Sequence, residues 1–277
     1  MTRPQAGSPR IWITRLAALV LAPGLAACAA PAPEQQRADS LVTGRAGEEA
    51  GAEVAAEADE AAGFETFARS VPGEGMSGGV VVVDPATVLQ DGWIHMPLHG
   101  TTDYRMTYLD GRLAIRAEPR QSASGLIRRV AIDPARCPIL EWTWRVERLQ
   151  DAADLRVKAA DDVAASIFLL FGNPGLLSDP DPVPTLRYVW TNGRLARGAV
   201  IDNPYLPGTV RSLVVRNGGG PLGAWVSERR DIAADYWRAF GRAPGAPVGA
   251  VVLFTDNDQT GEPALAHYGA ARALCEE

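Results

Sequence analysis

Hydrophobic and polar residues alternate along much of the chain, and one segment shows this most clearly. In residues 141–147, EWTWRVE, Trp142, Trp144 and Val146 share one face and the polar residues share the other. A period of two predicts a β-strand with one face in the core and one in water. We therefore place both tryptophans in the core.

Turn residues separate further runs of this kind. Residues 104–108 and 112–116 flank Asp110-Gly111, a pair typical of a hairpin with a type I′ turn. The same pattern of an alternating run followed by Asn-Gly recurs in two later segments, 186–193 and 210–218. We expect these segments to form strands that end in tight turns.

One segment instead predicts a helix. Asp231 can cap the start of residues 232–240, and Gly241 can end them. The tail, 264–274, is ambiguous, because its alanines favour a helix whereas its alternating large residues favour a strand.

Two continuous apolar runs complete the pattern. Residues 164–171 and 248–254 are typical of central strands that are covered on both faces. Together with turns rich in Gly, Pro, Asn and Asp, these runs predict an all-β fold. We expect a two-sheet sandwich of jelly-roll type with one short helix.

The N-terminus has the three parts of an export signal. A start with three arginines precedes the apolar run 16–22, which is too short to span a bilayer, and small residues follow. Leu-Ala-Ala-Cys at 25–28 resembles the lipobox of bacterial lipoproteins, whose cysteine is acylated. We expect a signal peptide at 1–27 and a lipid on Cys28; an ordinary signal cleaved nearby is the alternative.

Residues 28–62 and 63–277 differ in composition. The first segment is rich in Ala, Glu, Pro and Gly and has no aromatic residue, which predicts a lipidated, disordered acidic tether. The second holds all six Tyr and all six Phe, which predicts a single β-sandwich domain. Ala29 after the cysteine is typical of sorting to the outer membrane, so we expect the domain to face the periplasm.

The charge balance narrows the choice of partners. The chain has 27 basic and 33 acidic residues, a net charge of −6, and loss of three arginines with the signal would make it −9. An acidic surface argues against nucleic acid as a partner.

Cys137 and Cys275 are the two cysteines beyond the lipobox. In an exported protein, two such distant thiols predict a disulfide, with two buried free thiols as the alternative. Neither has a second Cys or His nearby, as a zinc site would require.

Six short motifs occur in a recognisable order: Ser122-Ala-Ser124, Trp142-Thr-Trp144, Ala160-Asp-Asp162, Arg187-Tyr-Val-Trp190, residues 230–241 and residues 254–261. Together they resemble the bacterial domain of unknown function 3047 family over roughly residues 90–275. Val163 and Ala165 depart from the family pattern, which has an aromatic residue and an arginine there. The resemblance implies an exported β-rich domain and supplies no catalytic residue.

No motif identifies a catalytic centre. The chain has three histidines, and it lacks the metalloprotease, nucleophile-elbow and phosphate-loop patterns. Asp161 and Asp162, just before an apolar run, are candidates for acid–base catalysis across a cleft. The commoner explanation is a solvated entrance to a strand.

Asp256 and Asp258 begin a segment that partly resembles a calcium-binding loop. Its twelfth position is His267 in place of the glutamate of an EF-hand, which excludes that motif. A structural calcium site between strands stays open. The simpler explanation, which we prefer, is a polar turn between the last two strands.

Three tryptophans, Trp93, Trp190 and Trp225, are candidates for stacking on sugar rings. Burial in the core is the commoner role for any single tryptophan.

These observations favour a non-catalytic module of the cell envelope. We expect it to be tethered to the membrane by its lipid and to bind a glycan or another envelope ligand, with no cofactor apart from the calcium ion just discussed. The alternatives are a carboxylate-dependent hydrolase acting on envelope polysaccharide and a structural lipoprotein that recruits a protein partner.

Overall fold

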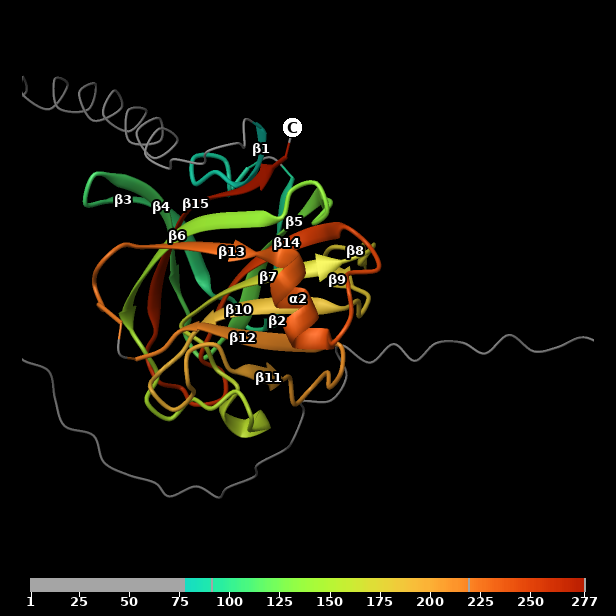
Figure 1. Ribbon diagram of the computed structural model, residues 1–277. Coiled ribbons are helices and arrows are strands. Elements are labelled where there is room, and N and C mark those ends of the chain that lie inside the picture. Colours follow the sequence, from blue (N-terminus) through green and yellow to red (C-terminus); the bar gives the residue numbers. More distant parts are fainter. Residues whose placement is uncertain (1–77, 91, 219, 277) are drawn as a thin grey trace, which may run out of the picture. The chain divides into compact units, whose positions relative to one another are not determined.

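The alternating and apolar runs form strands in a computed structural model that describes residues 78–90, 92–218 and 220–276 (Figure 1). The predicted signal peptide, Cys28 and the predicted tether at 28–62 lie outside these residues. Two large antiparallel-rich sheets pack face to face, which confirms the predicted two-sheet sandwich of jelly-roll type.

The first sheet, sheet A, has the strand order β13-β6-β15-β4-β3, with β1 also paired to β15. Its strands are β1 (Gly78–Val83), β3 (Asp103–Leu109), β4 (Arg112–Glu118), β6 (Ile139–Arg148), β13 (Val226–Asp231) and β15 (Leu265–Cys275). The ambiguous tail is therefore a strand, and it lies in the middle of this sheet.

The second sheet, sheet B, has the order β11-β12-β10-β7-β14-β5-β2. Its strands are β2 (Trp93–His99), β5 (Ala123–Ile132), β7 (Ala165–Phe171), β10 (Thr185–Trp190), β11 (Val200–Asp202), β12 (Val210–Arg216) and β14 (Val248–Asp256). The two continuous apolar runs form β7 and β14, which are central as predicted, and the structure pairs them with each other. A short hairpin of β8 (Gly175–Leu176) and β9 (Asp179–Pro180) stands apart.

The core between the sheets is built on aromatic side chains. Trp142 on β6 stacks against Tyr188 on β10, with ring centroids 5.1 Å apart, and Trp144 lies 5.7 Å from Trp190. All four rings are fully buried. The predicted core role of Trp142 and Trp144 is confirmed.

One predicted turn is confirmed and another is wrong. Asp110 and Gly111 join β3 to β4 with φ values of 52° and 72°, as a type I′ turn requires. By contrast, β10 does not turn back at Asn192-Gly193, because its partner β12 runs parallel to it. The Asn192 side chain instead donates to the backbone oxygens of Gln150 and Ala153.

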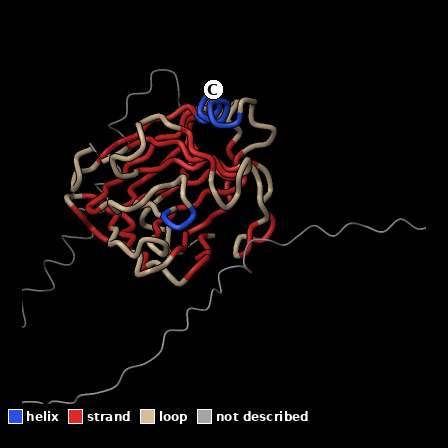
Figure 2. The backbone as a smooth tube through the Cα atoms, turned by 90° about the horizontal axis from the view of Figure 1, so that it is seen from below, coloured by secondary structure: helices blue, strands red, loops and turns tan. Residues whose placement is uncertain are grey.

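The described residues contain one α-helix, α2 (Ile232–Phe240), and a 3₁₀ turn, η1 (Lys158–Ala160). Figure 2 shows the two helical segments in blue among the red strands and tan loops. Asp231 caps α2 by accepting from the amide of Ala234 at 2.8 Å, and Gly241 ends it with φ 69°, as the sequence predicts. Asp235 accepts from Tyr188 of sheet B and pairs with Arg230 of sheet A, so the helix links the two sheets.

The C-terminal strand is fastened at its end. Cys137, which precedes β6, and Cys275, which ends β15, form a disulfide. The predicted pairing of these two cysteines is present in the structure.

Candidate functional site

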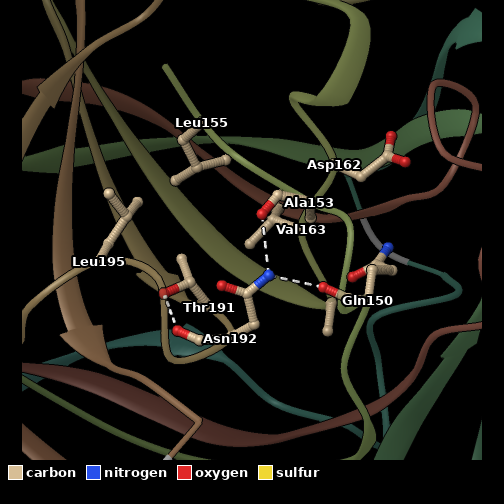
Figure 3. A pocket seen from close by; sticks show the side chains of 9 residues that line it. Gln150, Ala153, Leu155, Asp162, Val163, Thr191, Asn192 and Leu195 are labelled. Atoms are coloured by element: carbon tan, nitrogen blue, oxygen red, sulfur yellow. Dashed lines mark hydrogen bonds between the residues drawn. The ribbon is translucent and has the colours of Figure 1, made fainter. Parts of the chain in front are cut away.

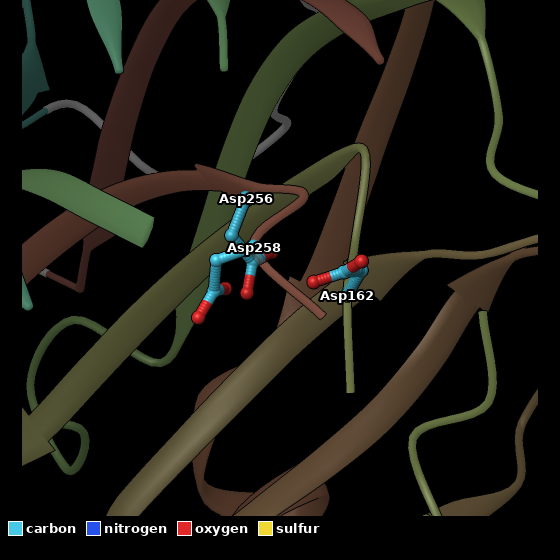
Figure 4. A group of neighbouring side chains, drawn as sticks. All are labelled: Asp162, Asp256 and Asp258. Carbon is cyan, nitrogen blue, oxygen red and sulfur yellow. The ribbon is translucent and has the colours of Figure 1, made fainter. Parts of the chain in front are cut away.

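Two pairs of aspartates that are far apart in sequence meet at one end of sheet B. Asp161 and Asp162 precede β7, while Asp256 ends β14 and Asp258 lies in the turn after it. Because β7 and β14 are antiparallel neighbours, the start of one strand lies beside the end of the other. Carboxylate oxygens of Asp162, Asp256 and Asp258 all lie within 4.8 Å of one another (Figure 4).

Arg187, in the middle of β10, extends into this group of carboxylates. Its neighbours Leu186 and Tyr188 face the core, so Arg187 lies on the outer face of sheet B, the face turned away from sheet A. Its Nη1 lies 3.4 Å from Asp161 Oδ1, and its Nη2 lies 4.0 Å from Asp256 Oδ1. The residue is only 3% exposed, yet its Nε and Nη2 have no hydrogen-bond partner among the described residues.

Backbone and side-chain donors fix the aspartates in place. Asp162 accepts from the amide and hydroxyl of Thr260, each at 2.6 Å, so the turn after β14 is fastened to the strand entrance. The amide of Val163 donates to Asp256 at 2.8 Å, and Asn203 donates to Asp161 at 2.9 Å. The carboxylates therefore converge in a defined geometry.

Three of these carboxyl groups have raised pKa values. Burial raises the pKa of Asp161 to about 6, although the Arg187 guanidinium opposes the shift. Burial raises the pKa of Asp256 well above its usual range, and the charges of Asp162 and Asp161 add to this. Burial and then the charge of Asp162 raise the pKa of Asp258.

Aromatic side chains border the acidic group. The Arg187 guanidinium lies 5.1 Å from the ring centroid of Phe168, which stacks on Phe254 at 5.4 Å. Tyr205, which is 41% exposed, is linked to the group through Asn203, which accepts from the Tyr205 amide and donates to Asp161. The site is therefore open to solvent at Tyr205 and at the partly exposed Asp258.

A cavity of about 10 Å³ lies beside Asp162 (Figure 3). Gln150, Val163 and Asn192 are among its lining residues. This volume accommodates about one water molecule and no larger ligand.

The predicted aromatic residues do not form one surface. Trp190 is fully buried in the core, so the prediction that it stacks on a ligand is wrong. Trp93, on the edge strand β2, packs beneath Arg128. Trp225 lies on sheet A, against His267.

The sequence analysis did not identify Arg187, the residue beside which the aspartates lie. Arg187 belongs to a motif that carried the family resemblance, but the motif gave the arginine no role. The available signal was a single charge within TLRYVW, a strand whose six residues are all buried.

The fold and the site together define a class: a two-sheet β-sandwich of jelly-roll type with a charged cluster on the outer face of one sheet. The chain belongs to the DUF3047 family, described as proteins of unknown function, which matches residues 91–272. The family expected from the short motifs is thus confirmed. No curated protein matches the chain.

Solved structures of several sandwich domains resemble the chain at low identity. The family 11 carbohydrate-binding module of cellulase Lic26A-Cel5E from Clostridium thermocellum is 8% identical, with a TM-score of 0.38, covering 72% of this chain and 95% of that one. The K3 cleaved adhesin domain of Lys-gingipain from Porphyromonas gingivalis is 11% identical, with a TM-score of 0.37, covering 71% and 99%. The CBM22-1 xylan-binding domain from Paenibacillus barcinonensis Xyn10C is 10% identical, with a TM-score of 0.34, covering 73% and 98%.

The two packed sheets, and not these low similarities, define the fold of the chain.

Among the described residues, no helix has the length and apolar character needed to cross a membrane.

Proposed function

We propose that this protein is a non-catalytic module that binds a glycan of the cell envelope on the outer face of sheet B. One observation carries the proposal: the aspartate cluster lies beside Arg187, a buried side chain that is close to Asp161 and Asp256 and has two nitrogens without a hydrogen-bond partner among the described residues. Buried polar groups normally have partners, so these donors call for an acceptor from outside the described chain.

Sugar hydroxyls match this mixture of groups. A hydroxyl donates one hydrogen and accepts up to two, so neighbouring hydroxyls can donate to the aspartates and accept from Arg187. The exposed ring of Tyr205 offers an apolar face for the C–H side of a sugar. This combination of a few polar groups with an aromatic ring is typical of a small-ligand site.

The proposed place of action is the outer membrane. The lipobox-like sequence ending at Cys28 supports a lipid anchor, and the acidic segment that follows supports a tether facing the periplasm. Both lie outside the described residues, so they enter here as part of the proposal.

The test is direct binding of envelope polysaccharides and peptidoglycan fragments to the mature chain carrying Cys28→Ala, measured by calorimetry. We expect Arg187→Gln to weaken binding about 10- to 100-fold, the effect of losing charge-assisted hydrogen bonds of about 1.5–3 kcal/mol. Arg105→Gln is the matched control, because Arg105 is exposed on sheet A.

Folding of each variant is checked by circular dichroism. Asp258→Asn provides a second test at a partly exposed position. Failure of the wild-type chain to bind any envelope glycan would overturn the proposal. So would binding that neither Arg187→Gln nor Asp258→Asn changes.

A second candidate, a glycan hydrolase, is favoured by one observation. Glycosidases use two nearby carboxyl groups, of which the acid has a raised pKa, and the pKa of Asp161 is raised to about 6 within this cluster. Release of reducing ends from a bound polysaccharide, abolished by Asp161→Asn, would identify the hydrolase. Binding without any such release identifies the module.

A further inference from the structure

We propose that Asp162, Asp256 and Asp258 bind a divalent cation, calcium, and that this cation takes part in ligand binding. The role in ligand binding rests on the proposed function. The cation site itself rests only on the geometry of the cluster and is tested without a glycan.

The three carboxylates have the spacing of a shared cation site. One oxygen from each residue lies within 4.8 Å of an oxygen from each of the others. Calcium binds oxygens at about 2.3–2.6 Å, so two of its ligands are separated by at most roughly 5 Å. One ion can therefore contact all three residues with little movement of the side chains.

The charges of these carboxylates are not balanced by the protein. Among the described residues, no cationic group lies within 4.0 Å of Asp162 or Asp258, and Asp256 has only Arg187, at 4.0 Å. Asp162 and Asp256 are 1% and 5% exposed. Buried charges in proteins are normally paired or bound to a metal ion.

Two further observations point to a ligand in this cluster. Asp258 Oδ1 is buried and has no hydrogen-bond partner among the described residues. Arg187 extends into the cluster with its Nε and Nη2 equally without acceptors. A cation satisfies the carboxylate oxygen, and an oxygen that the cation carries, from water or from a sugar hydroxyl, accepts from the arginine.

The donor set selects the kind of cation. All three ligands are hard carboxylate oxygens, which suit calcium or magnesium better than zinc or copper. Calcium accepts six to eight oxygens in flexible geometry, whereas magnesium requires a tight octahedron at about 2.0–2.1 Å. Three aspartates leave calcium several positions, and a pair of sugar hydroxyls can occupy two of them.

The experiment is calorimetric titration of calcium chloride into the mature Cys28→Ala chain after treatment with a chelator. We expect one calcium per chain and a higher melting temperature in excess calcium. Asp258→Asn should weaken calcium binding at least ~10-fold, because one charged ligand is lost. Asp179→Asn, on the exposed start of β9, is the matched control and should bind as the wild type does.

Three outcomes would overturn the cation site: no heat and no change in melting temperature at millimolar calcium, equal affinity in Asp258→Asn that is folded by circular dichroism, or tighter binding of magnesium chloride than of calcium chloride. The glycan titrations are then repeated with calcium and with chelator. Glycan binding that the chelator leaves unchanged would overturn the role of the cation. Calcium binding without glycan binding would leave the cation site standing and reject the proposed function.

Discussion

The hydroxyl of Tyr268 on β15 lies 2.7 Å from the hydroxyl of Thr255 on β14, so a hydrogen bond joins the two sheets inside the core. The Tyr268 hydroxyl also donates to the Phe254 carbonyl at 2.7 Å and accepts from the amide of Ser166 at 3.1 Å. Thr255 directly precedes Asp256, so this network fixes the end of the strand that bears the site.

Tyr268→Phe should therefore lower the free energy of unfolding by about 1–3 kcal/mol, because it leaves buried polar partners unsatisfied. Urea unfolding followed by tryptophan fluorescence measures the change. Tyr108→Phe, at a position that is 41% exposed, is the control and should change stability by less than ~0.5 kcal/mol. Equal effects of the two substitutions would contradict the role of the network.

Loss of the disulfide should destabilise the domain strongly. The cysteines are 138 residues apart, and in the chain-entropy model closing a loop of this length contributes about 5 kcal/mol. Replacing both Cys137 and Cys275 with serine should lower the urea midpoint accordingly. Reducing agent should lower the midpoint of the parent and leave the double variant unchanged; a parent that does not respond would contradict the prediction.

The stability of the domain should depend on pH through His267. Burial lowers the pKa of this histidine below its ordinary value of 6.5, while Glu147 opposes the shift and Arg145 and Arg116 favour it. Between the lowered pKa and 6.5 the unfolded chain binds the proton and the folded chain does not. Stability contributed by His267 is therefore present above pH 6.5 and is lost as the pH falls below it.

We accordingly expect the free energy of unfolding to fall more between pH 7.5 and 5.5 in the wild type than in His267→Gln. Subtracting the pH dependence of the variant from that of the wild type cancels the contribution of the other titrating groups. A steeper slope in the variant would reverse the sign and reject the assignment.

Cys28→Ala should release the protein from the membrane. The substitution removes the thiol that would be acylated, and with it the proposed lipid anchor. Fractionation of cells and partition into detergent measure the change, with Cys137→Ser as a control that keeps the lipobox. A Cys28→Ala protein that stays in the membrane fraction would rule out the lipid anchor.

Local patterns predicted the elements of this fold well. The alternation in 141–147 identified β6, Asp110-Gly111 identified the turn between β3 and β4, and Asp231 with Gly241 bounded α2. Each of these features depends on residues that are close together in the sequence, so a local pattern is enough to predict it. The turn predicted at Asn192-Gly193 is absent: the side chain of Asn192 bonds to a distant loop, and the next strand to pair with β10 is the parallel strand β12.

The site could not be predicted in the same way, because its residues meet through contacts between segments that are distant in the sequence. Alternation shows which residues of β10 share a face, but it does not show which face meets the other sheet. Trp190 therefore remained a ligand candidate although it lies in the core, and Arg187 went unnoticed on the opposite face. The meeting of Asp162 with Asp256 follows from the register of β7 and β14, which is set by the whole sheet.

The pairing of β1 with β15 has a mechanical consequence. Gly78 at the start of β1 is opposite Cys275, so β1 and the end of β15 lie beside the disulfide. A force that pulls on β1 is passed to β15 by their backbone hydrogen bonds. From the end of β15, the Cys137–Cys275 disulfide passes it to the loop before β6. The strands β7, β10 and β14 that carry the acidic cluster lie in the other sheet, so a load that enters through β1 must cross from sheet A to sheet B before it reaches a ligand at the cluster.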